Sequence, residues 1–181
     1  MLSSLGVDAI TASDTIAALK LDQSCRAEIQ QTGKIIPYGK HYIDECDIAA
    51  VVKTLKSGFL TQGPSIDAFE KQFADKVGAK YAVAVSSATA GLHLSYLSLG
   101  LRPGKSVLTS PITFVSTANA ALFCGGGVQF SDIDPTTINI AYEQVERRLS
   151  IDENISIVTP VVFAGAASGI PVIAKLAKLN G

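Results

Sequence analysis

Apolar residues recur along this chain at two spacings, one typical of amphipathic helices and one typical of short buried strands. The helical spacing predicts a helix from Asp44 to Gly58, one from Ser65 to Gly78, one that ends at Gly100, and helices at 115–123, 142–149 and 170–179. Runs rich in β-branched residues predict strands at 81–85, 106–109, 128–133 and 155–162. Strands and helices alternate from residue 81 onward, which predicts an α/β fold with a mainly parallel sheet and helices on both faces.

Capping signals support the first two of these helices. Asp44 stands three residues before Asp47, which resembles a capping box, and Ser65 is predicted to cap the next helix. The glycines at the ends of both helices are typical C-terminal stops. Residues 1–34 show only modest helical periodicity, so we interpret them as an N-terminal extension with one or two short helices.

Composition narrows the class of protein. The 181 residues are enough for one substantial core, and 48% of them are hydrophobic, which is typical of a globular protein. The net charge is −1 and no basic block occurs, which argues against nucleic acid as a partner. No apolar run reaches the roughly 20 residues that span a bilayer, and the N-terminus lacks the features of a signal peptide. Three widely spaced cysteines suggest reduced thiols and no zinc site, so we expect a soluble cytoplasmic protein.

The stretch at 80–100 combines a predicted strand, a turn of small hydroxyl residues and the start of a helix. Ser86, Ser87 and Thr89 leave the turn open and supply hydroxyl donors. A helix N-terminus after such a turn presents free backbone N–H groups and the positive end of the helix dipole, which suits a phosphate group. The alternative is an ordinary connection in which a serine or threonine only caps the helix.

Phe114 follows the predicted strand at 106–109, at the edge where open α/β sheets bind ligands. Its ring either packs in the core or stacks on a planar ligand. A phosphate-binding turn one strand away from a stacking ring would hold a flat phosphorylated cofactor. Pyridoxal 5'-phosphate fits that description best.

The rest of the sequence gives weaker indications of a catalytic or ligand-binding site. The chain has no P-loop, no dinucleotide fingerprint in the right context and no hydrolase nucleophile elbow. His41 is expected to be exposed in a loop, and His93 is expected to pack partly buried in a helix. Asp132 and Asp134 could form a metal or acid/base pair, but turn and cap roles are the stronger expectation.

Six segments in order resemble one family. They are I-I-P-Y-G-K at 35–40, S-G-F-L-T-Q-G-P at 57–64, A-V-S-S-A-T-A-G-L-H-L at 84–94, T-S-P-I-T-F-V-S-T-A-N-A at 109–120, D-I-D-P-T-T-I-N-I at 132–140 and T-P-V-V-F-A-G at 159–165. With them, residues 35–181 resemble the DegT/DnrJ/EryC1/StrS sugar-nucleotide aminotransferases, and most closely their pseudaminic-acid branch. The resemblance implies that 35–181 is the N-terminal portion of a pyridoxal-phosphate-binding domain with the aspartate-aminotransferase (type I) fold.

The resemblance also implies roles for individual residues. Ala88 and Thr89 would bind the cofactor phosphate, Phe114 would stack on the pyridine ring, and Ser87 and Thr117 would support them. The residues that would line the sugar-nucleotide side are Tyr38, Gly58, Phe59, Leu60 and Thr61. The implied reaction transfers an amino group, typically from L-glutamate, to a UDP-linked 4-keto-6-deoxy amino sugar, at a site that family members build in a homodimer.

The chain departs from the family pattern in three respects. Family members are roughly twice as long, and their Schiff-base lysine would lie beyond residue 181. Lys175 and Lys178 have ordinary surface spacing and do not replace it, and Val162 stands where the family has a histidine. We therefore predict no catalytic residue within the chain and no transaminase activity for it alone. The alternative is a non-catalytic binding or assembly module that pairs with a full-length subunit.

Overall fold

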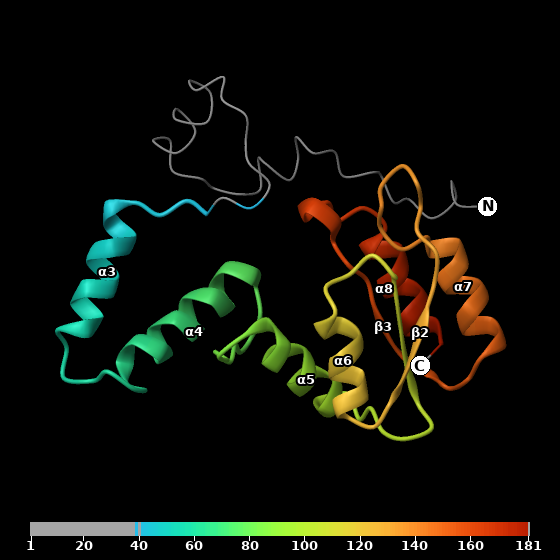
Figure 1. Cartoon of the computed structure of the whole chain (residues 1–181), viewed down its shortest axis with the longest axis horizontal. Helices are drawn as coiled ribbons and strands as arrows, with labels where there is room; N and C mark the ends of the chain where they lie inside the picture. Colours follow the sequence, from blue (N-terminus) through green and yellow to red (C-terminus); the bar gives the residue numbers. More distant parts are fainter. Residues whose placement is uncertain (1–38, 40, 181) are drawn as a thin grey trace. The chain divides into compact units, whose positions relative to one another are not determined.

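The computed structural model describes residue 39 and residues 41–180 (Figure 1). The predicted extension at 1–34 and the candidate Tyr38 lie outside the described residues. The described residues divide into two compact units, one that ends at residue 85 and one that begins at residue 86. The described part of the first unit is helical, and the second unit contains a sheet.

The first unit contains helices α3 (Glu45–Leu55) and α4 (Pro64–Val77). The capping box predicted before α3 is confirmed. The Asp44 carboxylate accepts a hydrogen bond from the Asp47 backbone N–H at 3.0 Å, and the Asp47 carboxylate accepts one from the Asp44 N–H at 3.0 Å. These bonds satisfy donors that a helix N-terminus otherwise leaves unpaired, and a cap of this kind contributes about 1 kcal/mol.

The predicted cap at Ser65 is wrong. Helix α4 begins one residue earlier, at Pro64, with Gly63 as the N-cap residue at φ 92°. Proline suits the first helical position because its φ is already helical and it has no N–H to leave unpaired. Glycine is required before it, because a Cβ at Gly63 would lie 2.7 Å from the Phe59 Cβ. The predicted stop at Gly78 is confirmed, with φ 69°.

The strand predicted at 81–85 is also wrong. These residues form no hydrogen-bonded strand, and Tyr81 and Val83 are 75% and 77% exposed. The backbone N–H of Ala84 donates instead to the Glu70 carboxylate at 2.7 Å. A β-branched run becomes a strand only where another strand offers hydrogen-bond partners, and no described residue offers them here.

The apolar stripes of α3 and α4 remain exposed. Their members are Ile48, Val51, Val52, Leu55, Ile66, Phe69, Phe73 and Val77. Phe69 and Phe73 stack on each other with ring centroids 6.0 Å apart. Ala74 is the single buried residue of this unit within its described part. Local caps and turn residues, rather than a core, therefore define these helices.

The second unit alternates helices and strands along the chain. Its elements are α5 (Ala88–Ser98), β1 (Ser106–Thr109), α6 (Ser116–Phe123), β2 (Gly127–Phe130), α7 (Tyr142–Ile151), β3 (Ile155–Thr159), the short 3-10 helix η1 (Phe163–Gly165) and α8 (Ile170–Leu179). The three strands are parallel and lie in the order β2-β1-β3. The predicted α/β class and parallel sheet are confirmed.

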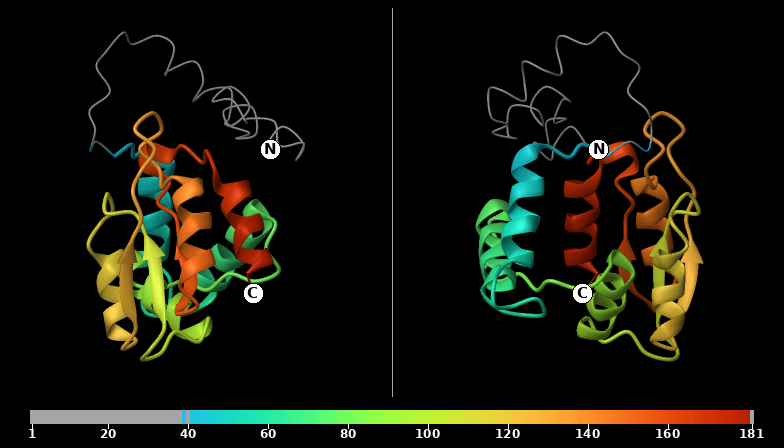
Figure 2. Two further views of the ribbon diagram at one scale, coloured as in Figure 1. Left: turned by 90° about the vertical axis from the view of Figure 1, so that its right-hand side faces the viewer. Right: turned by 60° about the vertical axis from the view of Figure 1, so that its left-hand side comes forward.

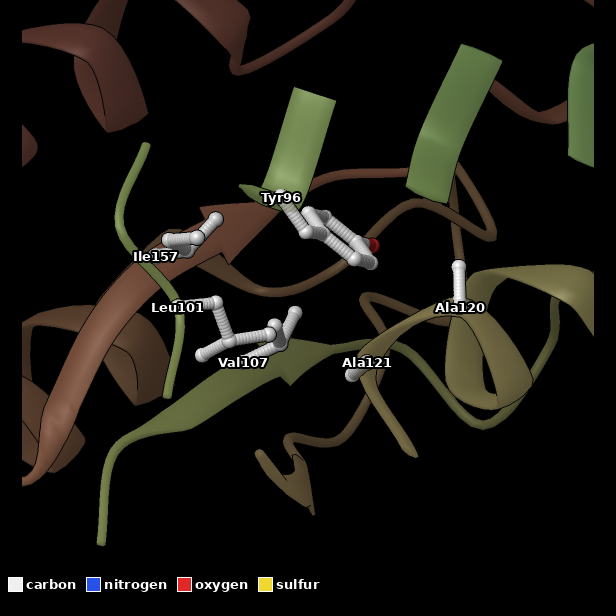
Figure 3. Packing of buried hydrophobic residues seen from close by; sticks show 6 residues of the cluster. All are labelled: Tyr96, Leu101, Val107, Ala120, Ala121 and Ile157. Carbon is white, nitrogen blue, oxygen red and sulfur yellow. The ribbon is translucent and has the colours of Figure 1, made fainter. Parts of the chain in front are cut away.

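Helices cover both faces of the sheet, as predicted (Figure 2). Under α5 and α6 the core contains Tyr96, Leu101, Val107, Ala120, Ala121 and Ile157 (Figure 3). Under α7 and α8 it contains Leu108, Ile140, Val145, Ile155 and Ile173. The pairing of β1 with β3 shifts register between Ser106 and Val107. Because of this shift, Ile155 and Ile157 face opposite sides although they are two residues apart.

Two strands are shorter than predicted. Strand β2 ends three residues before 133, and β3 ends three residues before 162. Pro160 follows β3 directly and has no N–H to extend the ladder. Beyond β2, Ile133 forms an isolated antiparallel bridge with Ile140 instead of continuing the parallel strand.

Three polar side chains connect β2 with the C-terminal end of α7. The Gln129 side-chain amide donates to the Asp152 carboxylate at 2.6 Å, and its carbonyl oxygen accepts from the Arg148 guanidinium. The hydrogen bond from Gln129 holds the pKa of the Asp152 carboxyl below its ordinary value, and the backbone N–H of Asn154 adds to this effect.

Replacing Gln129 with alanine is expected to raise the pKa of Asp152 toward its ordinary value. A carboxyl whose folded pKa is depressed adds stability above its unfolded pKa, and this stability is lost as the pH falls through the folded pKa. The Gln129→Ala chain should therefore be less stable than wild type at neutral pH, and this part of the difference should vanish in acid. A carbon-13 NMR titration of the Asp152 carboxyl measures the shift. Gln144→Ala, at an exposed position of α7, is the matched control; equal pKa values in both variants would contradict the assignment.

Candidate functional site

Helix α5 begins at a serine cap. Ser87 has extended backbone angles, φ −163° and ψ 161°, and its hydroxyl accepts from the Ala90 N–H at 3.2 Å. The N–H groups of the first helical residues, Ala88 and Thr89, have no partner within the helix. The 11-residue helix therefore presents backbone donors and the positive end of its dipole at the exposed Ala88.

Thr89 and Ser116 connect the N-termini of α5 and α6. Their hydroxyl oxygens lie 2.7 Å apart, which is a hydrogen bond in which either group can donate. Ser116 is the first residue of α6 and is 6% exposed, whereas Thr89 is half-buried. Two positive helix ends therefore lie together at one pair of hydroxyl groups.

Phe114 lies in the loop between β1 and α6 and is 76% exposed. The core-packing alternative for this residue is therefore wrong, and its ring is free to stack on a ligand. Hydrogen bonds give the loop a defined shape. The Ser110 hydroxyl accepts from the Ile112 N–H at 3.0 Å, and the Phe114 carbonyl accepts from the Thr117 N–H at 3.0 Å.

A network of hydroxyl groups connects α5 and α6 with the carboxyl ends of β1 and β3. The Tyr96 hydroxyl lies 3.2 Å from the Thr117 carbonyl oxygen and 3.1 Å from the Thr159 hydroxyl. The Thr117 hydroxyl accepts from Thr113 at 2.7 Å, and the Thr109 hydroxyl donates to the Thr159 carbonyl at 2.8 Å. Burial raises the pKa of Tyr96, so its hydroxyl stays protonated and donates at neutral pH. The network connects the C-terminal part of α5 and the N-terminus of α6 to the sheet, and the Thr89–Ser116 hydrogen bond connects the N-terminus of α5 to that of α6.

Four of the five residues predicted to line the sugar-nucleotide side are described, and they belong to the first unit. Residues 58–61 lie in the loop between α3 and α4, and all four are exposed. Ser57 shapes this loop, because its hydroxyl donates to the Thr54 carbonyl at 2.8 Å and accepts from the Phe59 N–H at 3.3 Å. The structure thus gathers the predicted cofactor residues in one unit and the predicted substrate loop in the other.

Both histidines have the environments that the sequence predicts. His41 is exposed in a loop. His93 is half-buried in α5, and its ring meets the Phe123 ring edge-on with centroids 5.7 Å apart. Packing against Phe123 explains this histidine without a catalytic role.

The two aspartates near the end of β2 have turn roles, as expected. The Asp134 carboxylate accepts from the Thr136 N–H at 2.6 Å, and the Asp132 carboxylate accepts from the Ile133 N–H at 2.8 Å. Among the described residues, no group of three or more histidines, cysteines and acidic residues could hold a metal ion. Within the same residues, no helix combines the length and the apolar character that crossing a membrane requires.

The lysines among residues 86–180 lie apart from the Thr89–Ser116 pair. Lys105 precedes β1 and donates to the Glu153 carbonyl at 2.9 Å, at the amino end of the sheet. Lys175 and Lys178 are exposed on α8, which covers the other face. None of them is placed to react at this pair.

A polar hollow of about 260 Å³ lies beside the end of β2. Its lining residues are Phe130, Ser131, Asp132, Gln144, Arg147, Arg148 and Ile151. Ser131 is 5% exposed, and its hydroxyl has no hydrogen-bond partner within the described part of the chain. The hollow contains none of the residues predicted to bind cofactor or substrate.

Sequence reasoning assigned no role to Ser116. Its partner Thr89 is 27 residues away, and a pairing over that separation depends on how α5 and α6 pack. One feature of the sequence could have indicated Ser116. It is a small hydroxyl residue at the start of a predicted helix, as Ser87 and Thr89 are at the start of α5.

Comparisons with known proteins show which family of sequences this chain matches. The family described as "DegT/DnrJ/EryC1/StrS aminotransferase family" matches residues 41–181. The spore coat polysaccharide biosynthesis protein SpsC of Bacillus subtilis is 40% identical over 153 residues, which cover 84% of this chain and 39% of that protein. The UDP-4-amino-4,6-dideoxy-N-acetyl-beta-L-altrosamine transaminase of Campylobacter jejuni is 41% identical over 145 residues, which cover 80% of this chain and 38% of that protein.

The fold has a solved counterpart. The structure of Helicobacter pylori PseC, an aminotransferase involved in the biosynthesis of pseudoaminic acid, matches with a TM-score of 0.73 and 30% identity. The match covers 81% of this chain and 39% of that one. The predicted partial aminotransferase fold is therefore confirmed, and the chain spans about two fifths of the length of the relatives that it matches.

Proposed function

Because the chain belongs to the DegT/DnrJ/EryC1/StrS aminotransferase family, we propose that it is part of a pyridoxal-phosphate-dependent enzyme acting on a sugar nucleotide. The observation that carries the proposal is the pair of helix N-termini that meet at Thr89 and Ser116 near a loop with an exposed aromatic ring. Residues 35–181 would form the N-terminal portion of the cofactor-binding domain, preceded by an extension at 1–34.

The described residues fit the two ends of pyridoxal phosphate. Aminotransferases of this family depend on that cofactor, and solved structural relatives contain it or its amino form. A phosphate dianion only accepts hydrogen bonds, and the N-terminal turn of α5 offers the N–H groups of Ala88 and Thr89 and the Thr89 hydroxyl. The exposed ring of Phe114 offers a flat apolar face for the pyridine ring.

The substrate proposed for the whole enzyme is a UDP-linked 4-keto-6-deoxy amino sugar, with L-glutamate as the amino donor. The Campylobacter jejuni relative, whose name specifies a UDP-sugar transaminase, supports this choice. We propose that the loop at 58–61 and Tyr38 contact the sugar nucleotide, in a cytoplasmic homodimer.

The bound cofactor supplies the electron-accepting ring through which the amino group is transferred. The N-terminal turn of α5 would hold its phosphate, Phe114 would orient its ring, and the Tyr96 network would fix the start of α6 relative to the sheet. No lysine among residues 86–180 lies beside Thr89 and Ser116. We therefore propose that the 181-residue chain alone gives no transaminase turnover.

Binding of two vitamin B6 forms tests the proposed cofactor site. Pyridoxine 5'-phosphate has the ring and the phosphate but no aldehyde that reacts with lysines, and pyridoxine lacks the phosphate. The 181-residue chain should bind the phosphorylated form more tightly in a calorimetric titration. Phe114→Ala should weaken both ligands alike, by about fivefold to tenfold, because it removes the stacking contact that both rings share.

Phe123→Ala is the matched control for this substitution. Phe123 lies at the other end of α6 and is 60% exposed, so its removal should leave both affinities unchanged. Equal binding of the two ligands by the wild-type chain, or no binding of either, would contradict the proposed phosphate site.

A further inference from the structure

We propose that Ser116 is a positioning residue for the cofactor phosphate, an inference that rests on the proposed function. Its hydroxyl donates to Thr89 Oγ1, so that the Thr89 proton is left for the phosphate. The side chain of Ser116 thus acts through Thr89 and need not touch the ligand.

The direction of the hydrogen bond follows from the donors that are available. Each hydroxyl has one proton to donate and can accept from others. The 2.7 Å contact between the two oxygens uses one of their two protons. A phosphate dianion, the main form of a phosphate monoester above a pH of about 6, has no proton to donate, so Thr89 must give its own proton to the ligand. The contact then persists only if Ser116 is the donor.

Burial makes Ser116 suited to this role. Ser116 is 6% exposed, and the contact with Thr89 is the single side-chain hydrogen bond recorded for it in the described part of the chain. With little water at its hydroxyl, the proton of Ser116 has Thr89 Oγ1 as its available acceptor. The buried group therefore loses a favourable contact whenever the Thr89 hydroxyl rotates away.

The hydrogen bond also restricts Thr89 itself. Threonine in a helix divides between two χ1 rotamers, so the hydroxyl of an unsupported Thr89 would be aimed at the site for only part of the time. Accepting a bond from Ser116 selects one rotamer and polarises the Thr89 O–H toward the ligand, because hydrogen bonds in a chain strengthen one another.

The test compares the phosphate preference of variants, defined as the affinity for pyridoxine 5'-phosphate divided by that for pyridoxine. Ser116→Ala should lower this preference by about fivefold to tenfold, the effect of one hydrogen bond that supports a charged ligand. Its affinity for pyridoxine should stay at the wild-type value, because the ring contact is intact. Ser131→Ala removes a hydroxyl from another buried serine and should change neither affinity.

A double substitution separates positioning from packing. Thr89→Val keeps the shape of the side chain and removes its hydroxyl, so it should lower the phosphate preference by itself. In the Thr89→Val chain, adding Ser116→Ala should have no further effect, since the group through which Ser116 acts is gone. Independent, additive effects would overturn the inference.

The remaining binding results distinguish failure of the Ser116 role from failure of the proposed cofactor site. If the wild-type chain prefers the phosphorylated ligand and Ser116→Ala keeps that preference, the role of Ser116 is refuted while the cofactor site stands. An equal loss of both ligands in Ser116→Ala would show a structural effect and would also refute it. If the wild-type chain shows no preference, the proposed cofactor site fails, and the role of Ser116 fails with it.

Discussion

Replacing Tyr96 with alanine is expected to lower the free energy of unfolding of the sheet-containing unit by about 4 kcal/mol. Tyr96 is 2% exposed and packs between α5, α6 and the sheet (Figure 3). The substitution leaves a cavity the size of an aromatic ring, and it removes the hydroxyl that bonds to Thr117 and Thr159. Urea unfolding followed by circular dichroism measures the loss.

Two further variants divide this effect into its parts. Tyr96→Phe keeps the ring and removes only the hydroxyl, so it should cost about 1–2 kcal/mol. Tyr81→Ala is the control for a tyrosine outside any core, because Tyr81 is 75% exposed, and it should change stability by less than about 0.5 kcal/mol. A Tyr96→Ala chain that unfolds at the same urea concentration as Tyr81→Ala would contradict the packing described for this residue.

Replacing Asn139 with alanine is expected to cost about 3 kcal/mol, because it breaks a buried network of hydrogen bonds. Asn139 is 4% exposed. Its side-chain amide donates to the Ala166 carbonyl and to the Ser168 hydroxyl, both at 2.8 Å, and its carbonyl oxygen accepts from the Phe163 N–H at 2.9 Å. The substitution leaves these partners without their bonds and frees the segment that follows β3.

Local opening of that segment distinguishes this loss from a general destabilisation. Hydrogen exchange at the Phe163 N–H should accelerate in Asn139→Ala more than exchange in β1, because the lost bond is at Phe163. Asn119→Ala is the control, since Asn119 is half-buried in α6 and no side-chain hydrogen bond is recorded for it in the described part of the chain. Equal acceleration at Phe163 and in β1 would contradict the local role of Asn139.

Elements with local signals were predictable from sequence. The capping box at Asp44 and the helix at 170–179 depend on neighbouring residues, and the structure has both. The run at 81–85 failed because strand formation needs a partner far away in the sequence, and propensity alone does not supply one. The cap at Ser65 failed because Pro64, whose fixed φ suits the first helical position, begins the helix and so places Ser65 inside it.

In the candidate site, too, features that depend on neighbouring residues could be predicted, and features that depend on packing could not. A serine or threonine cap at the start of α5 could be considered from sequence because a cap depends on its own helix, and the structure has Ser87 at that position, whereas its role toward the cofactor stays a prediction. The exposure of Phe114 could not be decided, since an aromatic residue after a strand is found both in cores and in binding sites. The role of Ser116 could not be predicted from sequence because its partner Thr89 belongs to a different helix. Only the packing of α5 against α6 brings the two hydroxyl oxygens to 2.7 Å.

The uncovered run at 81–85 also bears on how copies of this chain behave at high concentration. Five consecutive residues of β-prone and small apolar type, without charge or proline, have the composition of segments that stack into cross-β fibrils. The Glu70 carboxylate occupies the backbone N–H of Ala84 and so withholds one donor from an approaching copy. Within the described part of the chain, no other backbone group of the run has a recorded hydrogen bond. We therefore expect the shelf life of the chain in concentrated solution to be limited by how fast copies nucleate, a rate that differs in kind from the free energy of unfolding.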